Sequence, residues 1–131
     1  MYILIIEDEE ANRGALVKIL EKEGHTTCWA ANGVGGLRMM RSEKPDLVLL
    51  DMMMPGMTGW DVARERLADP ELRKIPVIIL SGLGAEEIHR QGQVNVLTGI
   101  ALIMGKPFDT PALLSAINHL GELKKLDEHK D

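Results

Sequence analysis

An apolar run that ends in a single aspartate constrains this chain more than any other feature. The run from Leu47 to Leu50 leads directly into Asp51, and a turn that contains Pro55 and Gly56 follows. An apolar run of this length, bounded by turn residues, predicts a strand that is buried on both faces. Asp51 then lies at the carboxyl end of that strand, where open α/β sheets bind their ligands. The alternative is an aspartate that only begins a turn.

Four further strands and five helices are predicted along the rest of the chain. Apolar runs bounded by turn residues predict strands at residues 3–6, 26–30, 75–81 and 100–104. Apolar residues at helical spacing predict helices before Gly24, at residues 33–43, 58–67 and 85–91, and from Thr110 onward. The helix at 85–91 has the weakest pattern, because Gly92 and β-branched residues follow it. Strands that alternate with helices predict an α/β fold with a doubly wound, five-stranded parallel sheet.

The composition is that of an ordinary globular protein. Of the 131 residues, 45% are hydrophobic and 27% are charged, so we expect one domain over residues 1–126 and a polar tail at 127–131. The formal net charge of −5 argues against nucleic acid or an anionic membrane as the main partner. Cys28 is the only cysteine, and the amino terminus lacks the basic region of a signal peptide. A reducing compartment, and hence a cytoplasmic protein, is expected.

Chemically reactive side chains stand at the ends of four of the predicted strands. Glu7 and Asp8 follow the first strand, Asp51 ends the third, Ser81 ends the fourth and Lys106 follows the fifth. In a doubly wound sheet all of these lie at the carboxyl edge. Three carboxylates placed there repel one another unless a cation lies among them, and oxygen ligands without histidine or cysteine favour Mg²⁺. An acidic cluster that binds no metal is the alternative.

This set of residues is suited to phosphoryl transfer. A carboxylate such as that of Asp51 can act as a nucleophile and form an aspartyl phosphate. Mg²⁺ and the ammonium group of Lys106 would neutralise the oxygens of the transferred group. The hydroxyl of Ser81 and the backbone amide of Gly82 could donate hydrogen bonds to the same oxygens.

The chain resembles the receiver domain of a two-component response regulator over nearly its whole length. The residues that carry this resemblance are Glu7-Asp8, the run from Asp51 to Gly59, Ser81 and Lys106-Pro107-Phe108. The resemblance implies a flavodoxin-like (βα)5 fold whose sheet has the strand order 2-1-3-4-5. It also implies that Asp51 accepts a phosphoryl group from the phosphohistidine of a histidine kinase or a histidine phosphotransfer protein, as in a phosphorelay.

The resemblance assigns roles at the expected metal site. Asp8, Asp51 and the backbone carbonyl of Met53 would hold Mg²⁺, and Glu7 would act partly through water. Lys106 would pair with Asp51 and with the phosphoryl group. Glu7 is one methylene longer than the aspartate often found at this position, which should shift the metal slightly without losing it.

The resemblance also identifies the residues of a conformational switch, and here the chain departs from the family. Ser81 would move to bond the phosphoryl group. Three residues before the lysine, the family usually has a tyrosine or phenylalanine whose ring then swings inward, and this chain has Ile103. A readout that depends on such a ring is therefore not expected. The apolar residues at 94–100 indicate either an altered face of the fourth helix and fifth strand or one longer loop.

Two apolar residues flank the expected phosphorylation site. Met53 stands two residues after Asp51, and Leu83 stands two residues after Ser81. In the family that the chain resembles, residues so placed influence how readily water attacks the acyl phosphate. Because neither side chain can orient that water, we expect a long-lived phosphorylated state.

The leading hypothesis is a stand-alone phosphorylation switch that alters a protein-binding face around the fourth helix, fifth strand and fifth helix. A downstream protein would bind this face, and a homodimer could form through it. A phosphorylation-independent binding module is the alternative, and a fragment of a larger regulator or hybrid kinase also fits. Conventional enzyme turnover is not expected, because phosphatases with an aspartyl nucleophile commonly need an acid where Met53 stands. The chain should promote only its own phosphorylation and dephosphorylation.

Overall fold

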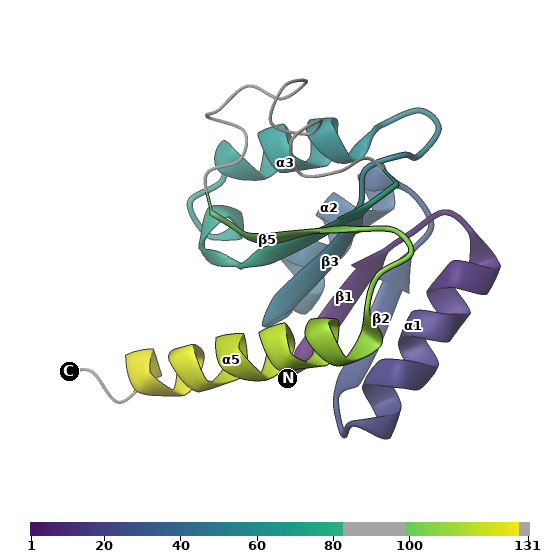
Figure 1. The fold of residues 1–131 in the computed structure, drawn as a ribbon. Coiled ribbons are helices and arrows are strands. Elements are labelled where there is room, and N and C mark those ends of the chain that lie inside the picture. Colours follow the sequence, from purple (N-terminus) through teal and green to yellow (C-terminus); the bar gives the residue numbers. More distant parts are fainter. Residues whose placement is uncertain (83–98, 129–131) are drawn as a thin grey trace.

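A single parallel sheet forms the centre of the molecule (Figure 1). The computed structural model describes residues 1–82 and 99–128. Five strands lie in the order β2-β1-β3-β4-β5, and every neighbouring pair is parallel. The predicted sheet and its order are thereby confirmed. The strands are β1 (Tyr2–Ile6), β2 (Thr26–Ala30), β3 (Leu47–Asp51), β4 (Val77–Ser81) and β5 (Ile100–Gly105).

Helices cover both faces of the sheet. They are α1 (Glu10–Lys22), α2 (Gly33–Glu43), α3 (Gly59–Leu67) and α5 (Thr110–Glu128), with a short 3-10 helix, η1, at Leu72–Lys74. In Figure 1, α1 and α5 lie on one side of the sheet, and α2 and α3 lie on the other. The helix predicted at 85–91 lies outside the described residues. Within the described ranges, no helix combines the length and the apolar character needed to cross a membrane.

The sheet separates two hydrophobic cores, because successive residues of each strand point to opposite faces. Along β1, Ile3 and Ile5 pack with α1 and α5, whereas Leu4 and Ile6 pack with α2 and α3. β3 and β4 are buried at every position, which explains their nearly continuous apolar sequences. The two central strands therefore hold the residues that follow them on a rigid base.

Five element boundaries differ from the sequence predictions; two of them, the start of β1 at Tyr2 and the end of β5 at Gly105, differ by a single residue. β4 begins at Val77 and not at Ile75, because Pro76 has no N–H group to donate, although its carbonyl accepts a hydrogen bond from the Val48 amide. Thr58 is the N-cap of α3 and not its first residue. α5 continues to Glu128, so the first two residues of the predicted polar tail are helical, and the remaining residues of that tail lie outside the described part.

Candidate functional site

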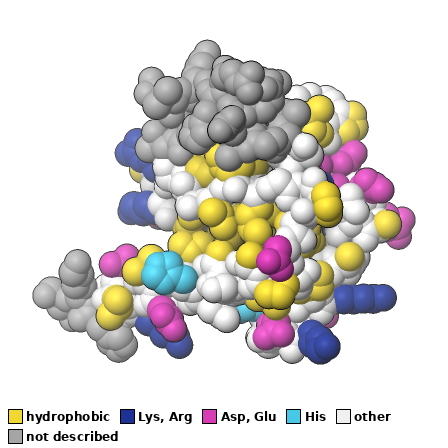
Figure 2. All heavy atoms as spheres, in the orientation of Figure 1, with side chains coloured by type: hydrophobic (Ala, Val, Ile, Leu, Met, Phe, Trp, Pro, Cys, Tyr) yellow, Lys and Arg dark blue, Asp and Glu magenta, His cyan; other side chains and the backbone are white. Residues whose placement is uncertain are grey.

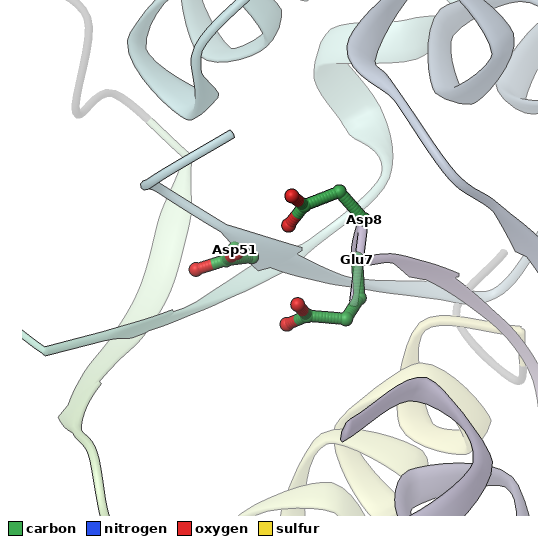
Figure 3. Close-up of side chains that lie close together, drawn as sticks. All are labelled: Glu7, Asp8 and Asp51. Carbon is green, nitrogen blue, oxygen red and sulfur yellow. The ribbon is translucent and has the colours of Figure 1, made fainter. Parts of the chain in front are cut away.

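Three carboxylates converge at the carboxyl edge of the sheet (Figure 3). Glu7 and Asp8 directly follow β1, and Asp51 is the last residue of the adjacent β3. Each of the three offers an oxygen atom, and these atoms all lie within 4.8 Å of one another. Glu7 and Asp51 are buried, whereas Asp8 is exposed to solvent. The structure therefore brings together the three acids that the sequence placed at one edge.

Lys106 reaches two of these carboxylates. Its Nζ lies 3.1 Å from Oε2 of Glu7 and 3.2 Å from Oδ1 of Asp51, so it donates a hydrogen bond to each. The backbone amide of Lys106 donates to the carbonyl of Ser81 over 2.6 Å, which ties the end of β5 to the end of β4. The Lys106–Pro107 peptide bond is cis. The two side-chain hydrogen bonds and the backbone hydrogen bond hold the lysine at the acidic cluster.

Burial and pairing act in opposite directions on the pKa values of Glu7, which is buried, and of Lys106, which is half-buried. Burial raises the pKa of Glu7 above its ordinary value, and the hydrogen bond from Lys106 only partly opposes this. For Lys106, burial lowers the pKa, but the Glu7 hydrogen bond and the Asp51 charge outweigh that effect and raise it. Lys106 is therefore fully charged at neutral pH.

The other contacts of Glu7 hold the end of β1. Its Oε1 accepts a hydrogen bond from the Glu9 amide at 3.1 Å, and its carbonyl accepts one from Arg13 Nη1 at 3.1 Å. The Arg13 guanidinium also lies 3.9 Å from the centroid of the Trp29 ring, a cation–π contact. Arg13 could not be identified from the sequence, because nothing in the sequence distinguishes an arginine exposed on a helix from one that donates a hydrogen bond to the end of a strand.

The segment after Asp51 is tightly held. The Met53 amide lies 3.3 Å from Oδ1 of Asp51, and the Gly59 amide donates to the Met52 carbonyl at 3.2 Å. A Cβ atom on Gly59 would lie only 2.7 Å from the Asp51 carbonyl oxygen, so only glycine allows α3 to start so close to β3. Thr58 and Asp61 then form a capping box that fixes the first turn of α3.

The predicted switch residues lie on the neighbouring strands. Ser81 is buried at the end of β4, directly beside the strand that carries Asp51, and Gly82 follows it at a bend. Ile103 is half-buried on β5, pairs with Ile79 and packs against the core beneath α2 and α3. Met53 is largely exposed. Leu83 lies outside the described residues. So do residues 94–98, which form most of the segment for which either an altered face or a longer loop was predicted.

Comparison with known proteins agrees with this geometry. The family model for the response regulator receiver domain matches residues 3–118. The chain belongs to this family. As a receiver domain it is similar to Protein PilH of Pseudomonas aeruginosa, with 39% identity over 88% of this chain and 93% of PilH. It is also similar to Sporulation initiation phosphotransferase F of Bacillus subtilis, with 37% identity over 93% of this chain and 94% of that protein.

A solved structure supports the fold assignment of this receiver domain. The receiver domain of a sensor histidine kinase from Pseudomonas aeruginosa superimposes with a TM-score of 0.80 and 24% identity. The match covers 92% of this chain and 97% of the other. At this level of identity the similarity establishes the fold alone. That other structure has a magnesium ion coordinated in its active-site cleft.

Proposed function

We propose that this receiver domain is a phosphorylation-dependent signalling switch with Asp51 as the phosphoacceptor. One observation carries the proposal: Lys106 Nζ lies between Glu7 and Asp51, at 3.1 and 3.2 Å, in a cluster of three carboxylates. Asp51 is a buried carboxylate beside a fixed ammonium group, which is the arrangement that an aspartyl nucleophile needs. The phosphoryl donor is the phosphohistidine of a histidine kinase or a histidine phosphotransfer protein.

The transfer itself is a single displacement at phosphorus. An oxygen of Asp51 forms the new P–O bond while the P–N bond to the donor histidine breaks, and the histidine ring keeps the electron pair. Lys106 then donates to an oxygen of the transferred group, because its Nζ already lies at hydrogen-bond distance from Asp51. Ser81 and the amide of Gly82 supply further donors from the adjacent strand end.

The charges of the site fit a divalent cation. When all three carboxylates are ionised, they and the one ammonium group carry a net charge of −2. Asp8, Asp51 and the carbonyl of Met53 would hold Mg²⁺ directly. Both side-chain oxygens of Glu7 already accept hydrogen bonds, from Glu9 and Lys106, so Glu7 would act through water. When bound, Mg²⁺ supplies electrostatic stabilisation of the transferring oxygens.

The output surface lies around β5 and α5. Figure 2 shows hydrophobic side chains gathered over β5, next to α5, and Leu102, Leu123 and Leu126 are exposed on these two elements. Exposed apolar surface of this kind suits a protein partner. We place the contact with the downstream protein here, together with a homodimer contact if one forms. Ile103 on the same strand would transmit the change through packing and not through a swinging ring.

Signalling of this type takes place in the cytoplasm, and we assign the chain to that compartment. The chain catalyses only its own phosphorylation and dephosphorylation. No acid stands two residues after Asp51, where Met53 is found, to assist repeated turnover of another phosphorylated substrate.

Tryptophan fluorescence during titration with Mg²⁺ and then beryllofluoride tests the proposal. Trp60 is in the first turn of α3, close to the site, and packs against the core. We expect a Mg²⁺-dependent change that Asp51→Asn abolishes and that the surface control Asp127→Asn retains. Mass spectrometry after treatment with acetyl phosphate provides a second readout. No phosphate on Asp51 and no fluorescence change would instead favour a phosphorylation-independent binding module.

A further inference from the structure

One of the methionines is far more exposed than the others. The chain has eight methionines, and all of them lie within the described residues. Met53 is 65% exposed, whereas its neighbours Met52 and Met54 are 2% and 5% exposed. The remaining methionines are buried or half-buried: Met1, Met39, Met40, Met57 and Met104. Oxidation of a thioether requires access to the sulfur, so Met53 is the preferred target.

Met53 also stands at the centre of the candidate site. Its amide lies 3.3 Å from Oδ1 of Asp51, so its side chain leaves the backbone two residues from the carboxylate that would carry phosphate. The close approach of Gly59 to the Asp51 carbonyl fixes this segment against α3. A change in the polarity of the Met53 side chain therefore occurs on a residue whose backbone contacts the carboxylate that would carry phosphate.

We propose that Met53 is a reversible oxidation site whose sulfoxide form shortens the lifetime of phosphate on Asp51. This inference rests on the proposed phosphorylation of Asp51. The oxidant is hydrogen peroxide: one peroxide oxygen is transferred to the Met53 sulfur, an S=O bond forms, the O–O bond breaks and water leaves. Sulfur is oxidised and peroxide is reduced. A thiol-dependent methionine sulfoxide reductase restores the thioether.

The effect on phosphate follows from the polarity of the product. The thioether offers almost no hydrogen-bond capacity, whereas the sulfoxide oxygen is a strong acceptor and can hold a water molecule. A water held at this position attacks phosphorus, a new P–O bond forms, and the bond to the Asp51 oxygen breaks. The products are the free Asp51 carboxylate and inorganic phosphate. Oxidising conditions would thus switch the signal off faster.

The first experiment measures where oxidation occurs and does not depend on phosphorylation. The full chain is treated with hydrogen peroxide under native conditions, and tandem mass spectrometry follows sulfoxide formation at each methionine. We expect Met53 to oxidise first, with Met52 and Met54 on the same peptide as internal controls. Oxidation of Met53 at a rate no greater than that of the half-buried Met39 or Met57 would overturn the inference.

The second experiment measures the consequence. Wild type and Met53→Leu are each treated with peroxide or left untreated, then phosphorylated with acetyl phosphate, and loss of phosphate is followed. Peroxide should accelerate the loss in wild type by roughly two- to tenfold, the effect that one added hydrogen bond supports. It should not change the loss in Met53→Leu, and reductase treatment should reverse the effect in wild type.

The two experiments separate the inference from the proposed function. Acceleration of equal size in both proteins, or no acceleration in either, would contradict the role of Met53 while leaving phosphorylation of Asp51 intact. A protein that oxidises at Met53 but carries no phosphate on Asp51 would refute the proposed function, and with it the effect assigned to the sulfoxide.

Discussion

The ammonium group of Lys106 lies 3.1 Å from Oε2 of Glu7, although the two residues are 99 positions apart in the sequence. β1 and β5 do not pair with each other in the sheet, since β3 and β4 lie between them. The long side chains of both residues span this interval across the carboxyl edge. Glu7 thus anchors Lys106 on one side while Asp51 contacts it on the other, and the lysine is in place before any phosphoryl group arrives.

Replacement of Lys106 by methionine should separate metal binding from the response to phosphorylation. Loss of the ammonium group leaves the buried carboxylates of Glu7 and Asp51 without their counter-charge, so Mg²⁺ should bind more tightly. The fluorescence response to beryllofluoride should be strongly reduced, because the variant lacks the ammonium group that would donate a hydrogen bond to a fluorine of beryllofluoride bound at Asp51. Isothermal titration with Mg²⁺, alongside the fluorescence titration, checks both parts. Weaker Mg²⁺ binding would mean that the lysine does not compete with the metal.

Replacement of Met53 by asparagine should accelerate loss of phosphate from Asp51. An amide at this exposed position can orient water, which a thioether does poorly, so the decay rate should rise by about two- to tenfold. Leu126→Asn is the matched control, because Leu126 has the same 65% exposure as Met53 but lies near the end of α5. The measurement is the time course of phosphate loss in excess Mg²⁺. Equal decay in wild type and Met53→Asn would show that this residue does not limit the access of water.

Replacement of Gly59 by alanine should disturb both stability and the site. The added Cβ would lie 2.5 Å from the Met52 sulfur and 2.7 Å from the Asp51 carbonyl oxygen, so α3 must move away from β3. We expect a loss of about 1–3 kcal/mol in the free energy of unfolding, the usual cost of overpacking, and a weaker response to beryllofluoride. Urea unfolding measures the stability.

Gly14→Ala is the control for that substitution. Gly14 is in α1, and a Cβ there would meet no atom within 4 Å. Alanine should therefore stabilise the protein by up to about 1 kcal/mol, through helix propensity alone. Destabilisation of similar size in both variants would point to a general intolerance of alanine and not to the close approach of α3 to β3.

Asp46 should contribute to stability in a pH-dependent way. Its carboxylate accepts a hydrogen bond from the Tyr2 amide at 2.7 Å and pairs with Lys124, which attaches α5 to the start of β1. Burial acts to raise the pKa of Asp46, but these contacts outweigh it and hold the pKa below the ordinary 3.8. Since the pKa is depressed in the folded state, the contribution is complete well above pH 3.8 and is lost as the pH falls through the folded-state value.

Asp46→Asn tests this contribution. Because the pair is partly exposed, the substitution should cost only about 1 kcal/mol in the free energy of unfolding at pH 7. The difference between wild type and the variant should shrink toward pH 3. Urea unfolding at several pH values checks this, and a difference that stays constant with pH would exclude ionisation of Asp46 as the source.

Much of the fold and of the acidic cluster could be predicted from the sequence, because both depend on local patterns. Apolar runs mark the strands, and the topology of a parallel sheet brings the residues that follow β1 and β3 to one edge, which places Glu7, Asp8 and Asp51 together. The contact of Lys106 with Glu7 depends on the reach of two side chains across intervening strands. No pattern in the sequence encodes that reach.

Other features depend on packing that local sequence does not reveal. Arg66 is completely buried within α3, although an arginine in a helix normally predicts an exposed position. Trp29 lies on β2, where a large aromatic residue normally packs into a core, but it is half exposed and stacks with Arg13. In both cases the neighbouring elements determine the environment of the side chain, and those neighbours are distant in the sequence.

The hydrogen bond from the Lys106 amide to the Ser81 carbonyl has a mechanical consequence. The carbonyl of Ser81 accepts this hydrogen bond from Lys106, the residue that would bind the phosphoryl group. The hydroxyl of Ser81 would bind the phosphoryl group as well. A displacement of Ser81 would therefore also displace the end of β5. Because β5 is the outermost strand of the sheet, it can shift without breaking pairing on a second side. The proposed phosphorylation site thus lies at the end of a central, fully buried strand, and this hydrogen bond links it to an edge strand that another protein could contact.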